Sequence, residues 1–149
     1  MINFDGETIR VTLHLLGVAI WVGGQIVLAA LVPAVKAVGR TQTNGDTGPA
    51  RAGSSPVTKA MAQRFARVAW PAFIVTVVTG VWGLWAIDVA STTVGYQATL
   101  GLKLLLVAAT GIAAFLHAAS DQVVVKAATG AGGLVAALGA LVCGVLMAT

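Results

Sequence analysis

The sequence predicts an all-α integral membrane protein, a transmembrane four-helix bundle with both termini outside. Only 9% of the 149 residues are charged, whereas soluble domains carry about 25% charged residues. Four long apolar runs fill most of the chain, and each is near the ~20 residues that a helix needs to cross a bilayer. The runs cover residues 11–35, 66–87, 99–119 and 130–148. We therefore expect a single transmembrane domain over residues 1–149, with the lipid bilayer as its main partner.

The distribution of charge predicts the orientation of the chain. The connection between the first two runs, with its flanks, is basic and contains only one acidic residue, Asp46. Its basic residues are Lys36, Arg40, Arg51, Lys59, Arg64 and Arg67. Basic connections stay in the cytoplasm, and the centre of this one is rich in Gly, Pro, Ser and Thr. We therefore expect a flexible cytoplasmic loop at residues 40–63, in a multi-pass protein of the bacterial cytoplasmic membrane.

The first run carries polar residues on one face of the predicted helix. His14, Gly17, Trp21 and Gln25 are separated by three or four residues, which places them on the same side of a helix. A polar side chain within the membrane is costly and indicates a functional position. Gly17 and Gly24 would leave room beside this face for a flat ligand.

The second run is bounded by aromatic residues. Trp82, Trp85 and Tyr96 cluster at the expected outer interface, and Trp70 lies near the inner one. Aromatic belts of this kind anchor helices at the membrane surface and need no further function. Pro71 is expected near a helix end, where the missing backbone donor is tolerated.

The third run predicts a second polar face. Lys103, Thr110 and His117 recur every seven residues, nearly two helical turns, so the three share one side. A polar seam between the first and third helices follows from these two faces. At ~1.5 Å of rise per residue, Lys103 and His14 lie at a similar depth, whereas His117 lies about 21 Å further along the axis. His14 and His117 therefore cannot hold one metal ion together.

The fourth run is built from small residues. Gly133, Ala137, Ala140 and Gly144 recur at spacings of three and four, which lets helices approach closely. We expect a packing helix or an oligomer contact. Cys143, the single cysteine, lies deep in an apolar run, where packing is favoured over a ligand or redox role.

Each polar residue also has a structural interpretation. Lys103 can extend its amine to the outer surface, and His14 can simply hydrogen-bond a neighbouring helix. For His117, close to the interface, a structural role is favoured. The functional interpretation depends on finding two ionisable residues, His14 and Lys103, at the same depth in the membrane. They also lie on helices that can contact each other. The net charge of +4 follows from the topology and predicts no nucleic-acid partner.

Three segments, in order along the chain, resemble motifs of two related bacterial membrane families. The segments are HLLGVAIWVGG at residues 14–24, RFARVAWP leading into VVTG at residues 64–71 and 77–80, and GLKLLLV at residues 101–107. The families are the copper-resistance protein D domain and the HemJ-type protoporphyrinogen oxidase. The resemblance covers three of the four predicted helices.

The resemblance to the HemJ type implies a four-helix protein that binds haem b and oxidises a porphyrinogen. The functional histidine would fall on His14, as an axial metal ligand, and the functional lysine on Lys103. Gly17 and Trp21 would line the cofactor site. Lys103 would serve in catalysis as a proton donor, or as the sixth ligand. The family's second histidine falls closer to the lysine than His117 does, so His117 does not match it.

The resemblance to the copper-resistance D domain implies copper uptake or tolerance instead. Cu(I) favours grouped Met, Cys or His ligands, yet Met1, Met61 and Met147 are scattered and Cys143 is isolated. A haem needs only one or two axial ligands and an apolar slot, so haem is favoured and copper is the alternative. A third hypothesis is a non-catalytic subunit of a membrane complex. A homo-oligomer and a membrane redox partner both remain open.

Overall fold

The computed structural model describes residues 5–43 and 56–148, and these form helices and short connections. In chain order the elements are α1 (Gly6–Thr43), α2 (Pro56–Trp85), the 3-10 helix η1 (Val89–Ser91), α3 (Val94–Ala119) and α4 (Val123–Leu146). Each of the four α-helices is long and apolar enough to cross a membrane. The predicted all-α membrane architecture is therefore confirmed.

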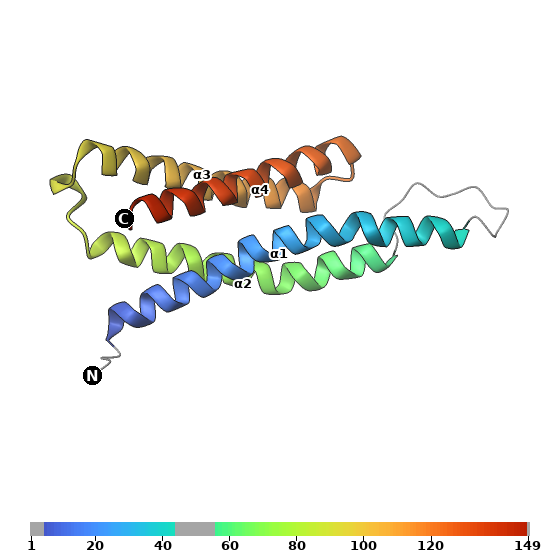
Figure 1. Cartoon of the computed structure of the whole chain (residues 1–149), viewed down its shortest axis with the longest axis horizontal. Coiled ribbons are helices and arrows are strands. Elements are labelled where there is room, and N and C mark those ends of the chain that lie inside the picture. Colours follow the sequence, from blue (N-terminus) through green and yellow to red (C-terminus); the bar gives the residue numbers. More distant parts are fainter. Residues whose placement is uncertain (1–4, 44–55, 149) are drawn as a thin grey trace.

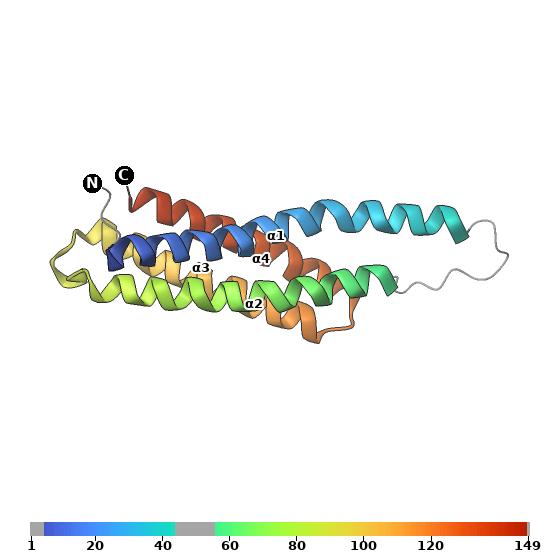
Figure 2. The same ribbon diagram turned by 90° about the horizontal axis from the view of Figure 1, so that it is seen from below.

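The four helices form two antiparallel hairpins (Figure 1). α1 packs mainly on α2, and α3 packs mainly on α4, while contacts between α1 and α4 join the two pairs. The start of α1 and the end of α4 lie at the same end of the molecule, as the two perpendicular views agree (Figure 2). We call this the terminal end, and the opposite end, near Lys59, Arg64 and Arg67, the basic end.

The helices are longer than the predicted membrane spans. α1 has 38 residues, about 57 Å at 1.5 Å per residue, against a hydrocarbon core of about 30 Å. Residues 40–43 and 56–63, predicted as loop, are helical, so the loop boundaries were wrong; residues 44–55 lie outside the described part of the chain. Apolar runs mark where a helix is in lipid, but the backbone hydrogen bonds are internal and let the helix continue into water.

Side chains close the helix ends at the terminal end. Asp5 precedes α1, and its carboxylate accepts hydrogen bonds from the backbone N–H and the hydroxyl of Thr8, both at 2.9 Å. These bonds hold the pKa of Asp5 below its usual range. Thr93 caps α3 through a hydrogen bond from the Tyr96 N–H at 3.3 Å. In the α2–α3 connection, the side-chain amide of Gln97 donates to the carbonyl of Val89 at 3.0 Å.

Small side chains dominate the buried core of the bundle. The buried hydrophobic residues are Trp21, Val22, Ala69, Ala72, Leu100, Ala136, Ala137, Ala140 and Cys143. In lipid the hydrophobic effect does not hold helices together, so close approach through small residues supplies the packing. The small-residue face of α4 is therefore used within the chain. Pro71 lies inside α2 rather than near its end, which corrects the sequence prediction.

Candidate functional site

His14 is fixed to α2 by one of its two ring nitrogens. Nδ1 lies 3.0 Å from the carbonyl oxygen of Thr76 and 3.0 Å from the hydroxyl of Thr79. The ring passes close to Gly80, where a Cβ atom would lie 3.4 Å from its Cε1. His14 itself is half-buried, so the imidazole is held at a defined orientation within the membrane.

The partners of Nδ1 determine the tautomer of His14. The Thr79 hydroxyl donates its proton to the carbonyl of Val75 at 2.6 Å, and the Thr76 carbonyl can only accept. Nδ1 must therefore carry the proton and donate it. The other ring nitrogen, Nε2, keeps a free lone pair that points away from Thr76. Metal-binding histidines typically show this arrangement, in which one nitrogen donates to a carbonyl and the other coordinates.

Lys103 lies on the face of α3 that packs against the last turn of α4. A Cβ atom at Gly144 would lie 3.3 Å from Nζ of Lys103, so the glycine provides the space for the amine. Lys103 interacts electrostatically with both His14 and Cys143. Three helices thus bring an imidazole, an amine and a thiol to one level in the terminal half of the bundle.

The predicted seam between the first and third helices is only partly correct. His14 finds its hydrogen-bond partners on α2, and the side chain of Lys103 packs against Gly144 of α4. One α1–α3 link exists near the middle of the bundle, where the indole N–H of Trp21 donates to the Thr110 hydroxyl at 3.4 Å. The Thr110 hydroxyl in turn donates to the carbonyl of Gly133 on α4 at 2.9 Å.

Trp21 and Gly17 are largely occupied by contacts within the chain. The Trp21 ring lies 4.4 Å from the Phe73 ring and 5.8 Å from the Trp70 ring, centroid to centroid. At Gly17 a Cβ atom would lie 2.8 Å from the carbonyl oxygen of Ala72. The room that the sequence offers at Gly17 is therefore filled by α2, and a role for either residue in holding a cofactor stays a prediction.

His117 lies far from this level, at the connection between α3 and α4. Its Nδ1 is 2.9 Å from the carbonyl oxygen of Lys126 and 3.4 Å from the hydroxyl of Thr129. The ring is exposed. These contacts close the α3–α4 turn, in keeping with the structural role that the sequence favours for this residue.

Cys143 is the neighbour of the site that sequence reasoning missed. It was predicted deep in the fourth span, but it lies three residues before the end of α4 and is buried with 6% of its surface exposed. The predicted topology could have indicated this position of Cys143. Because α4 ends at the same side where α1 starts, the last residues of α4 reach the depth of His14 and Lys103.

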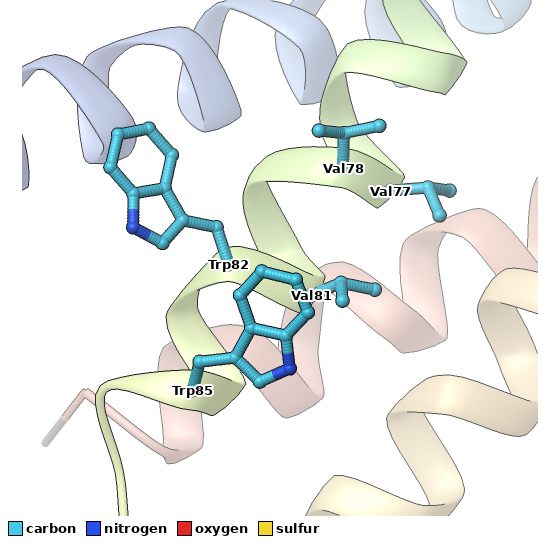
Figure 3. A pocket seen from close by; sticks show the side chains of 5 residues that line it. All are labelled: Val77, Val78, Val81, Trp82 and Trp85. Atoms are coloured by element: carbon cyan, nitrogen blue, oxygen red, sulfur yellow. The ribbon is translucent and has the colours of Figure 1, made fainter.

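Two apolar hollows lie on the outside of the bundle. The first, about 430 Å³, is lined entirely by residues of α2, including Val81, Trp82 and Trp85, and is a shallow depression of one helix surface (Figure 3). The second, about 500 Å³, lies between α2 and α3. Neither is lined by His14 or Lys103.

No protein-family model, curated protein or solved structure matches this chain. The resemblance to the two membrane families therefore stays a prediction. Within residues 5–43 and 56–148, no group of three or more His, Cys, Asp or Glu side chains is placed to hold a metal ion. A metal site in this part of the chain would depend on fewer protein ligands, as a haem iron does.

Proposed function

We propose that this chain is a haem b-binding membrane protein in which Nε2 of His14 would bind the iron. We further propose that it performs redox chemistry of the porphyrinogen oxidase type. The observation that carries the proposal is the donation of Nδ1 of His14 to the Thr76 carbonyl at 3.0 Å. This bond leaves Nε2 unprotonated, which is the state that iron requires.

The residues around His14 fit a haem in their donor chemistry. Imidazole nitrogen is a common axial ligand of haem iron, and the surrounding slot needs to be apolar. The neighbours of His14 on α2 are Thr76, Thr79 and Gly80, and the charges that act on it from the described residues are those of Lys103 on α3 and Arg10 on α1. The haem, when bound, would supply one-electron chemistry. The protein would hold the iron through His14 and deliver protons from Lys103, or ligate the iron through its amine.

Copper handling is less well supported as the alternative. Cu(I) would need two or three soft ligands in one group, and the described residues offer only His14 and Cys143 at one level. A non-catalytic role in a larger membrane complex has no observation in its favour beyond the membrane architecture. We place the protein in the bacterial cytoplasmic membrane with the basic end in the cytoplasm, because basic connections remain on that side.

The test is the absorption spectrum of the purified protein and of its His14→Ala variant. The wild-type protein should show a Soret band, and the variant should retain less than about a tenth of the haem, since losing the protein ligand removes the iron bond. His117→Ala is the matched control, because it removes an imidazole at the other end of the bundle. It should keep the wild-type ratio of haem to protein.

A second variant distinguishes the loss of the histidine that binds iron from a loss of the folded structure. His14→Gly leaves space for free imidazole, and added imidazole should restore the band. Wild-type protein without haem but with stoichiometric copper would contradict the proposal and favour the copper alternative. A haem content in His14→Ala equal to that of His117→Ala would exclude His14 as the ligand.

A further inference from the structure

Arg10 is a cation beside His14 that the proposed haem site does not yet use. It lies four residues before His14 on α1, so the two side chains leave the same side of the helix. Arg10 immediately precedes the apolar run at residues 11–35, and His14 lies about 6 Å further along the helix axis. The guanidinium is therefore placed at the polar edge of the span and the imidazole inside it.

Two glycines of α2, also one turn apart, provide the space for these two side chains. A Cβ atom at Gly83 would lie 3.1 Å from Cζ of Arg10, and one at Gly80 would lie 3.4 Å from Cε1 of His14. The guanidinium and the imidazole thus lie in one row along the contact between α1 and α2. Only 17% of the Arg10 side chain is exposed, so packing against α2 defines its position.

Arg10 binds Glu7 through only one edge of its guanidinium. Nε donates to one carboxylate oxygen of Glu7 at 3.0 Å, and Nη2 donates to the other, while Nη1 forms no hydrogen bond with the described residues. In residues 5–43 and 56–148, no buried side-chain nitrogen or oxygen lacks a hydrogen-bond partner. Nη1 is therefore not sealed inside the bundle, and its two N–H groups are available to a ligand.

The charges around the His14 imidazole are positive. Those that act on it from the described residues belong to Lys103 and Arg10, and no carboxylate is among them. In the same part of the chain, Lys103 takes no part in an ion pair, since the two pairs there join Arg10 to Glu7 and Lys126 to Asp121. The surroundings of His14 therefore favour an anionic ligand over a neutral one.

We propose, on the basis of the haem function proposed above, that Nη1 of Arg10 binds a carboxylate of the tetrapyrrole held at His14. Haem b and its porphyrinogen precursors carry their two propionate carboxylates at one edge of an apolar macrocycle. The site has the same division, with a cation at the edge of the apolar run and the imidazole within it. Arginine suits this role because its planar donors match a carboxylate. Arg10 is thus a residue that determines specificity for an acidic tetrapyrrole.

The test compares haem b with its dimethyl ester, in which both carboxylates are neutral while the iron and the macrocycle are unchanged. The full-length protein, freed of haem in detergent micelles, is titrated with each compound, and binding is followed at the Soret band. The wild type should bind haem b on the order of tenfold more tightly than the ester, as a hydrogen bond between charged groups provides. Arg10→Gln should lose most of this preference and bind the ester like the wild type, which also shows that it has folded.

Three further variants separate carboxylate binding from other effects. Arg67→Gln is the matched control, because it removes an exposed arginine at the basic end, and it should keep the preference. Glu7→Gln breaks the ion pair but retains Arg10, so it should also keep the preference. His14→Ala should weaken the binding of both compounds alike, since both carry the iron.

Four outcomes would overturn the role of Arg10. Equal binding of the two compounds by the wild type would exclude carboxylate recognition and leave haem binding at His14 intact, whereas binding of neither would overturn both proposals. Equal loss of the preference in Arg67→Gln and Arg10→Gln would reduce the effect to general attraction. Equal loss in Glu7→Gln would show that Arg10 acts only through the ion pair. If Arg10→Gln does not fold, Arg10→Lys keeps the charge without the planar donors, and a full wild-type preference in it would exclude recognition by Nη1.

Discussion

At the scale of single residues, His14 shows what a membrane sequence reveals and what it conceals. The sequence predicted a polar side chain at membrane depth, because such residues are rare and costly in lipid. It did not predict that the partner is the backbone of Thr76 on α2. Core-facing and lipid-facing positions are both apolar in this chain, so the periodicity that tells which way a helix faces is weak.

Lys103 is the residue whose chemical role is most directly testable. Lys103→Met keeps most of the apolar stem and removes the amine. If the amine delivers protons or ligates the iron, the turnover of a porphyrinogen should fall by roughly 10²-fold or more, as for a general acid, or the Soret band should shift. Porphyrinogen turnover and the absorption spectrum should be measured on the same preparation of the variant.

Leu105→Met is the control for the Lys103 variant. Leu105 is 70% exposed on the same helix, so its replacement should change neither quantity. Unchanged turnover and spectrum in Lys103→Met would show that the amine only occupies the end of α4. There it would compensate the negative end of the helix dipole beside Gly144.

At the scale of helices, sequence reasoning located the four spans but not their ends, nor the helix that each polar face contacts. Apolar runs report depth in lipid, so they marked the centres of α1 to α4 and missed the helical residues at 40–43 and 56–63. The small residues of α4 were correctly predicted to allow close packing, and their partner is α3 within the chain. The helix that packs against a glycine is chosen by the side-chain surfaces of both helices. The sequence of one apolar run describes only one of these two surfaces.

Gly17 provides a test of the α1–α2 pair. Gly17→Ala would place a Cβ atom 2.8 Å from the Ala72 carbonyl oxygen, so α1 must move away from α2. We expect destabilisation of about 1–3 kcal/mol, typical of overpacking, measured by unfolding in mixed micelles. The same shift should weaken the His14 hydrogen bond one turn away and lower haem retention.

Gly23→Ala is the matched control on the same helix. A Cβ atom at Gly23 meets nothing within 4 Å, so this change should be neutral or should stabilise α1 by up to about 1 kcal/mol through helix propensity. Equal effects of the two substitutions would show that helix propensity, and not the α1–α2 contact, governs position 17.

At the scale of the whole molecule, the two hairpins meet through few contacts. The hydrogen bonds from Trp21 to Thr110 and from Thr110 to Gly133 connect α1, α3 and α4 in the middle of the bundle. Thr110 is 2% exposed, so neither lipid nor water can replace these partners. The sequence predicted Thr110 on a polar face of the third helix, but not that it would bind two helices at once.

Thr110→Val should loosen the contact between the hairpins. The change preserves shape, removes the hydroxyl and leaves the Trp21 N–H without its acceptor, at a cost of roughly 1 kcal/mol in a membrane setting. Unfolding in mixed micelles should show it, with Thr99→Val as the control, because the Thr99 hydroxyl bonds only within its own helix, to Gly95 at 2.9 Å. Equal stability of the two variants would contradict a connecting role for Thr110.

The pairing of chain neighbours has a consequence for the order of biosynthesis. α1 and α2 are complete before α3 leaves the ribosome, and domains generally form as units in the order of their synthesis. The first hairpin contains His14 and both of its partners, Thr76 and Thr79. We therefore expect the imidazole to be oriented during insertion, before Lys103 arrives. If His14 binds haem as proposed, the first hairpin alone would already present the ligand nitrogen.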